Sequence, residues 1–139
     1  MLDVQPQFYK YPVSRSCGYS GNKLQIMRTL VKENTWLTRG LIDFGWGNGY
    51  VLIPEGHPLH GKHYDDIDVD VHGGLTFSEL VDDELIEKWD KLTEADKGMW
   101  MIGFDTAHYR DNLHTCPKEY VEAEAERLLE QVANYHAEA

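Results

Sequence analysis

The sequence has few cysteines and no long apolar run, and each lack excludes a class of protein. Its two cysteines, Cys17 and Cys116, lie far apart, so neither a disulfide framework nor a CxxC zinc knuckle is predicted. No apolar stretch approaches the roughly 18 residues that a membrane helix needs. The first residues contain no basic segment followed by an apolar one, so we expect no secretory signal and a cytoplasmic protein.

Basic residues are also scarce, because 13 Lys/Arg stand against 24 Asp/Glu and the formal net charge is −11. The acidic excess lies in residues 54–139, which carry seven basic and twenty-one acidic side chains, against six and three in residues 1–53. Direct nucleic-acid binding is not expected, because phosphate contacts need a basic surface. Solubility is the simplest role for such charge. The alternative is attraction to a basic partner, including the channel of a nucleic-acid-handling enzyme.

What the chain does contain is typical of one soluble, folded domain over residues 1–139. Its hydrophobic fraction of 42%, with four Trp, eight Tyr and four Phe, is too high for a disordered chain. We expect an α+β fold, with a small, mostly antiparallel sheet, two or three helices and the C-terminal helix packed on the sheet. Residues 1–22 are predicted to form an irregular N-terminal arm, and residues 78–97 a helical insert.

Three segments have the apolar spacing of helices. An apolar stripe over residues 85–92 predicts a helix that Gly98 ends, and a stripe over residues 121–132 predicts a longer helix that Pro117 begins. Residues 22–34 repeat apolar side chains at i, i+3, i+6 and i+7, which predicts a short helix there as well.

Other segments have the composition of strands. Residues 36–44 and 50–53 are rich in strand formers and flank the glycine-rich residues 45–49, which predicts a β-hairpin. Residues 99–104 are continuously apolar, which indicates a buried strand in the centre of the sheet.

The stretch from Asp66 to Gly74 alternates strictly between polar and apolar residues. As a β-strand it would place its apolar side chains on the core face and Asp68, Asp70 and His72 on the opposite face. Neighbouring carboxylates repel one another, and a bound cation is a common remedy. We therefore interpret this stretch as half of a metal site.

A second polar cluster follows the predicted strand at residues 99–104. If the two strands are neighbours, the clusters together predict a site for zinc or another divalent ion, because imidazole and carboxylate are common ligands. The alternative is that these side chains face solvent or cap turns. The predicted ligands are Asp70, His72, Asp105 and His108, with Asp68, His114 and Cys116 as secondary candidates.

Other catalytic or binding sites are less well supported by the sequence. His57, His60 and His63 recur every third residue in a Gly/Pro loop and could form an accessory site, although loop packing is the preferred interpretation for His57. The GxSxG, Walker, GxGxxG and HExxH motifs are absent, and no catalytic residue is predicted. One alternative is a metal-dependent hydrolase or nucleotide-processing enzyme, since a metal and a carboxylate base can activate water. Another is a binding protein that sequesters a nucleotide signal.

Two strings in the chain, VDVHGGLT and GFDTAH, together resemble a family of small phage and prophage proteins over about residues 46–132. The chain is also similar to type II-A anti-CRISPR metalloproteins of phage origin, which contain zinc and inhibit the guide-RNA-directed nuclease. This resemblance implies a phage-encoded inhibitor in the cytoplasm of the infected host that binds a type II CRISPR nuclease and blocks DNA loading without catalysing a reaction. The metal would then be structural.

Overall fold

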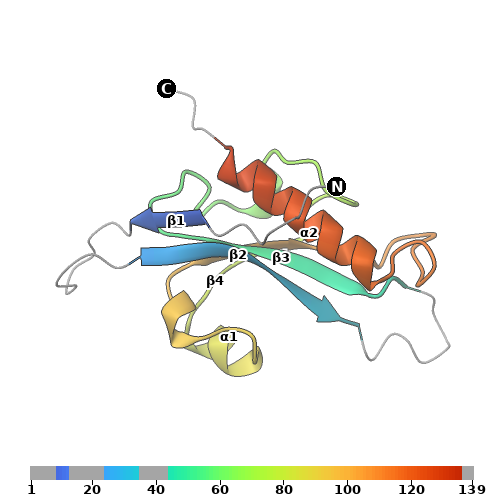
Figure 1. Ribbon diagram of the computed structural model, residues 1–139, viewed down its shortest axis with the longest axis horizontal. Helices are drawn as coiled ribbons and strands as arrows, with labels where there is room; N and C mark the ends of the chain where they lie inside the picture. Colours follow the sequence, from blue (N-terminus) through green and yellow to red (C-terminus); the bar gives the residue numbers. More distant parts are fainter. Residues whose placement is uncertain (1–8, 13–23, 35–43, 136–139) are drawn as a thin grey trace, which may run out of the picture.

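One antiparallel sheet of five strands, in the order β1-β2-β3-β5-β4, organises the chain (Figure 1). The computed structural model describes residues 9–12, 24–34 and 44–135. The strands are β1 (Tyr9–Pro12), β2 (Leu24–Glu33), β3 (Gly47–Ile53), β4 (Phe77–Leu80) and β5 (Trp100–Phe104). The helices are α1 (Asp83–Lys88) and α2 (Lys118–Ala133), with 3₁₀ turns η1 (Tyr64–Asp66) and η2 (Glu94–Asp96). The predicted α+β fold, with the C-terminal helix on the sheet, is confirmed.

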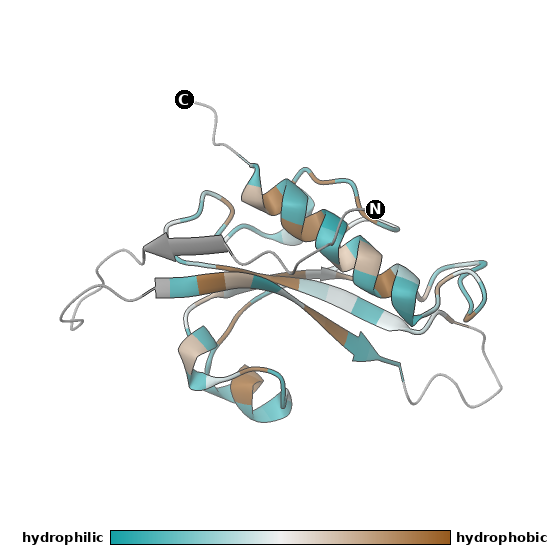
Figure 2. Cartoon of the chain, viewed as in Figure 1, coloured by the Kyte–Doolittle hydropathy of each residue, from teal (hydrophilic) through white to brown (hydrophobic). Residues whose placement is uncertain are grey.

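The sheet is covered on both faces, by α2 on one side and by α1 on the other (Figure 1). Because side chains alternate along a strand, β3 contributes to two cores at once. Val51 and Ile53 belong to the core under α2, whereas Tyr50 and Leu52 belong to the core over α1. The apolar stripe of α2 is visible as brown segments along the helix (Figure 2).

The helix predicted at residues 22–34 is wrong, because the sheet is covered on both faces. This segment forms β2, where Met27 is buried in the core under α2 and Leu30 in the core over α1. A strand with apolar side chains on both faces loses the simple alternation of a half-exposed strand and can acquire a helix-like spacing.

The glycine-rich residues 45–49 do not form the predicted turn, because Gly47 and Gly49 lie within β3. A Cβ atom on Gly49 would lie 2.6 Å from the ring of Phe104, so this glycine lets the helix-side core approach the backbone. Residues 50–53 are a strand as predicted, and they pair with β2 and β5. The strand predicted at residues 36–44 lies almost entirely outside the described residues.

The segment at residues 78–97 is less helical than predicted. It begins inside β4, which the sequence pattern did not reveal, and α1 ends at Lys88 because Trp89 leaves the helical conformation. The strand predicted at residues 99–104 is confirmed as β5, which lies between β3 and β4. Helix α2 begins one residue after Pro117, close to its predicted start.

The prediction that the stretch from Asp66 to Gly74 is a β-strand is wrong, because Ile67 to Val71 belong to no strand and His72 begins a turn. Side chains of α2 bind its backbone in place of a neighbouring strand. Gln131 accepts from the Asp70 N–H at 2.8 Å and donates to the Asp70 carbonyl at 2.7 Å. The predicted alternation persists, since Ile67 and Val71 are buried and Asp68 and Asp70 are exposed.

Of the predicted N-terminal arm, residues 9–12 form β1 and the remainder lies outside the described residues, as does Cys17. Among the helices of the described chain, none is both long and apolar enough to cross a bilayer.

Candidate metal centre

Three side chains that can ligate a metal meet beside the first turn of α2. His72 lies in the turn that follows Ile67 to Val71, and Asp111 and Cys116 belong to the loop that joins β5 to α2. One donor atom from each residue lies within 4.8 Å of the other two. We call His72, Asp111 and Cys116 the metal cluster.

The spacing of the three donor atoms suits a tetrahedral metal. His72 Nε2 lies 3.0 Å from Asp111 Oδ1 and 3.9 Å from Cys116 Sγ, and Cys116 Sγ lies 3.6 Å from Asp111 Oδ1. Zinc bond lengths of about 2.0–2.3 Å place neighbouring ligand atoms about 3.3–3.6 Å apart in a tetrahedron. The donors therefore need to move only slightly to bind one ion.

Asp111 lies at the centre of the cluster and is only 7% exposed. Its Oδ2 atom accepts from the His108 backbone N–H at 2.9 Å and lies 2.8 Å from His108 Nδ1. Burial on its own would raise the pKa of the Asp111 carboxyl, but hydrogen bonds from His72 and His108 outweigh burial, and the pKa is lowered. The carboxyl is therefore held in its ionised form, which is the form that binds a cation.

Cys116 is 2% exposed, and its thiol donates to Asp111 at 3.6 Å. Burial, with a contribution from the Asp111 charge, raises the pKa of this thiol. A protonated, buried thiol is a poor nucleophile. A bound cation would favour the thiolate, so the same position suits a metal ligand better than a catalytic cysteine.

His72 is oriented by contacts from α2. Its Nδ1 atom lies 2.8 Å from the Tyr120 hydroxyl, and its backbone N–H donates to Glu124 at 2.8 Å. For Nε2 to bind a metal, the neutral ring must carry its proton on Nδ1, which would then donate to the Tyr120 hydroxyl oxygen. Metal-binding histidines commonly have such a partner on the other ring nitrogen, because it fixes the ring orientation.

His108 and Asp105 border the cluster on its more exposed side. The Nε2 atom of His108 lies 3.4 Å from Asp105 Oδ1, and its other nitrogen faces Asp111. A Cβ atom on Gly73 would lie 2.3 Å from His108 Cε1, so the absence of a side chain there makes room for the ring. His108 is therefore placed to orient Asp111.

The structure brings together only part of the predicted ligand set. His72 and the secondary candidate Cys116 belong to the cluster, and His108 and Asp105 lie next to it. Asp70 is exposed and pairs with Arg127 at 3.2 Å. The remaining candidates, Asp68 and His114, are exposed and lie outside the cluster.

Asp111 belongs to the metal cluster but was not among the ligands predicted from the sequence. Its signal in the sequence is the His108-x-x-Asp111 spacing, which lets one turn bring both side chains together. The turn needs Arg110 at φ 75°, a conformation that is uncommon outside glycine. Spacing along the chain could have suggested the pair, but not its approach to His72 and Cys116.

The three loop histidines make separate contacts. His57 Nε2 lies 2.8 Å from the Val132 carbonyl, and His60 Nε2 lies 2.7 Å from the Gly98 carbonyl. His63 caps the 3₁₀ turn η1 by accepting from the Asp65 N–H. The packing role expected of His57 is confirmed, and among the described residues these three histidines do not form a group of metal ligands.

The metal cluster does not have the arrangement of a cysteine nucleophile activated by histidine and aspartate. In such a relay the imidazole uses one nitrogen for the nucleophile and the other for the carboxylate. Here Cys116 and Asp111 both face Nε2 of His72, and Nδ1 faces Tyr120. The donors converge on one point, as metal ligands do.

Comparison with known proteins identifies no relative of this chain. No protein-family model matches it, and neither a curated protein nor a solved structure is significantly similar to it.

Proposed function

We propose that the protein is a non-catalytic binding protein whose binding loop is braced by a zinc ion held by the metal cluster. The observation that carries this proposal is the convergence of His72 Nε2, the Asp111 carboxylate and Cys116 Sγ. A thiolate with an imidazole favours zinc over magnesium or calcium, which prefer oxygen ligands. When bound, the ion would cross-link segments that are distant in sequence and neutralise the charge of buried ligands.

The loop that the cluster would brace presents apolar side chains to solvent. Tyr109 is 90% exposed and Leu113 is 53% exposed, and both lie between or beside the cluster ligands in the loop. Exposed aromatic and aliphatic side chains on a fixed loop are typical anchors of protein–protein interfaces. Bracing this loop would reduce the entropy lost on binding.

The acidic surface supports a partner with a basic surface. The outward face of α2 carries four exposed glutamates, Glu119, Glu122, Glu126 and Glu130. A surface of this charge would be drawn to a groove that normally holds nucleic acid. We therefore propose that the partner is a host defence nuclease of the type II CRISPR class, met in the host cytoplasm and inhibited by obstruction of DNA loading. The resemblance of the VDVHGGLT and GFDTAH strings to phage proteins supports this partner class.

Zinc content and thermal unfolding of the wild type and two variants test the metal assignment. Purified wild-type protein should contain one equivalent of zinc, and chelation should lower its melting temperature. Cys116→Ala should lose the metal and the response to chelator. His114→Ala is the matched control, because His114 is exposed and outside the cluster. Wild-type protein that takes up no zinc under replete conditions would overturn the metal assignment.

A binding measurement addresses the partner separately. Zinc-loaded protein should bind a purified type II nuclease–guide complex and compete with target DNA. Tyr109→Ala should weaken this binding, because interface aromatic residues frequently dominate the binding energy, while zinc content stays unchanged. If the protein binds zinc but does not affect DNA loading by such nucleases, the inhibitor assignment is wrong and the metal assignment still stands.

One observation favours a second candidate function, a metal-dependent hydrolase. His108 and Asp105 are both about one-third exposed, and they form a pair on the solvent side of the cluster. Such a pair can act as a general base toward water. Metal-loaded protein that hydrolyses phosphodiester or nucleotide substrates, and loses this activity in His108→Gln, would favour the enzyme over the binding protein.

A further inference from the structure

The second half of β2 has an open edge. Residues 28–33 pair with β3 on one side, but on the other side the β1 ladder reaches only Met27. Within residues 9–12, 24–34 and 44–135, no strand pairs with this part of the outer edge. The Val31 carbonyl points outward, because it accepts from Lys91 Nζ at 2.6 Å. Antiparallel alternation then places the backbone groups of Thr29 and Glu33 on the same edge.

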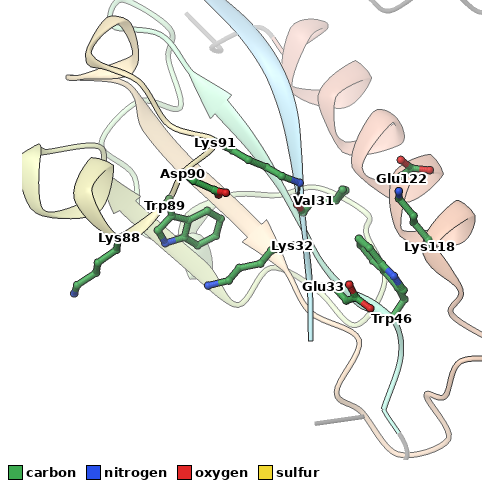
Figure 3. A pocket seen from close by; sticks show the side chains of 10 residues that line it. All are labelled: Val31, Lys32, Glu33, Trp46, Lys88, Trp89, Asp90, Lys91, Lys118 and Glu122. Carbon is green, nitrogen blue, oxygen red and sulfur yellow. Dashed lines mark hydrogen bonds between the residues drawn. The ribbon is translucent and has the colours of Figure 1, made fainter. Parts of the chain in front are cut away.

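A groove follows this edge. A cavity of about 460 Å³ runs from Val31 to Glu33, and a second of about 300 Å³ continues along Thr29 to Val31. Trp46 and Trp89 lie on opposite sides of β2 in the larger cavity (Figure 3). The groove therefore exposes a strand edge with an aromatic side chain on each face of the sheet.

Positive charge gathers on the α1 side of the groove, although the whole chain has a net charge of −11. Lys32 lies 4.6 Å from the centre of the Trp89 ring and makes no ion pair with any described residue. Lys118 lies 5.6 Å from the Trp46 ring and is likewise without an ion pair in the described chain. The charged residues that line the larger cavity are Lys32, Lys88, Lys91 and Asp90 around α1, and Lys118, Glu33 and Glu122 toward α2.

We propose that this edge of β2 binds an extended peptide segment of a partner protein that carries acidic side chains at alternate positions. Thr29, Val31 and Glu33 would supply the backbone hydrogen bonds of an added strand, and Lys91 would leave the Val31 carbonyl to pair with a carboxylate of that strand. Every second side chain of that strand would face Lys32 and Lys91, which favours carboxylates there. The intervening side chains would face Val31 and Trp46, where apolar groups fit.

This inference goes beyond the proposed function, because the groove shares no residue with the metal cluster. Charge favours the acidic segment over the edge of a second copy. Two copies with a net charge of −11 each repel one another, whereas the lysine side of the groove attracts a carboxylate.

Synthetic eight-residue peptides, titrated against purified full-length protein, test the proposal. A peptide that alternates valine and glutamate should shift the backbone amide signals of Thr29, Val31 and Glu33 in NMR spectra. A peptide that alternates valine and lysine should bind about tenfold more weakly, because it places like charges together. N-methylation of alternate amides in the valine–glutamate peptide should also abolish binding, because a methylated amide cannot pair with the strand edge.

A matched pair of variants separates the groove from general charge attraction. Lys32→Glu should weaken binding of the valine–glutamate peptide about tenfold, whereas Lys62→Glu, an exposed lysine outside the groove, should not. Equal binding of the N-methylated peptide, or no shift along β2 with any peptide, would overturn the proposal. It would also fail if these amides are already protected from exchange in the peptide-free monomer, or if sedimentation shows that a second copy covers the edge.

Discussion

His72 Nε2 lies 3.0 Å from both carboxylate oxygens of Asp111, although 39 residues separate the two positions in the chain. Cys116 approaches the same nitrogen, while the opposite ring nitrogen faces Tyr120. Nε2 of His72 thus faces the other two cluster residues, and Nδ1 makes the contact that orients the ring. This division of roles predicts that Tyr120 affects metal binding without being a ligand.

Tyr120→Phe should lower zinc affinity about tenfold while one zinc still binds at saturation, because loss of a hydrogen bond to a ligand weakens its orientation. Competition with a chromophoric chelator measures this affinity. Tyr109→Phe removes an equivalent hydroxyl from an exposed ring and should leave the affinity unchanged. Unaltered zinc affinity in Tyr120→Phe would show that the hydroxyl does not orient His72.

Two adjacent glycines provide a second test of the cluster. Gly73 and Gly74 both have positive φ, 69° and 83°, so alanine should cost about 1 kcal/mol of folding stability at either position. An added Cβ at Gly73 would also meet the His108 ring at 2.3 Å, whereas one at Gly74 meets nothing within 4 Å. Gly73→Ala should therefore weaken zinc binding and Gly74→Ala should not, as measured by calorimetric zinc titration. If Gly73→Ala and Gly74→Ala bind zinc with equal affinity, the position of the His108 ring does not affect metal binding.

The sequence predicted elements whose apolar pattern is simple. Helix α2 has one apolar stripe and one polar face, and β5 is apolar throughout, so both were predictable from spacing. Strand β2 was not, because its side chains enter cores on both faces of the sheet. The segment from Ile67 to His72 has the alternation of a strand but lies outside the sheet, because side chains of α2 satisfy its backbone.

The residues of the candidate metal site were predictable only in part, for a related reason. His72 and His108 were predictable, because each lies in a short polar cluster beside apolar residues. Which carboxylate joins them depends on the turn before α2, and that turn selects Asp111 over Asp70 and Asp105. Such long-range convergence is a property of tertiary packing and is not encoded in local spacing.

Arg28 and Asp96 form a bidentate ion pair on the α1 side of the sheet. Burial opposes ionisation of Asp96, but hydrogen bonds from Arg28 and Thr93 outweigh it and lower the pKa of its carboxyl. Arg28→Met should therefore reduce the free energy of unfolding at pH 7 by about 2–3 kcal/mol, because a nearly buried carboxylate loses its charged partner.

The pH dependence of this effect has a definite sign. A lowered pKa in the folded state stabilises the protein above the unfolded carboxyl pKa of about 3.9, and this contribution is lost as pH falls through the folded value. The difference between wild type and Arg28→Met in urea unfolding should therefore shrink on acidification below that range. Lys97→Met is the control, because its partner Asp83 is exposed and surface pairs contribute little. A difference that stays constant down to acid unfolding would show that the ion pair does not account for the loss.

The contacts of the buried His57 ring predict a second effect of pH on folding stability, near neutral pH. Its Nδ1 accepts from the Leu59 N–H at 3.0 Å while its Nε2–H donates to the Val132 carbonyl, so both contacts are made together only by the neutral ring. Burial lowers the pKa of His57. The unfolded chain then binds a proton more readily, and stability should fall as pH drops below about 6.5 toward the lower folded value. In His57→Gln this portion of the pH dependence of urea unfolding should disappear. A wild-type His57 signal that titrates at or above 6.5 in NMR spectra would contradict the neutral ring.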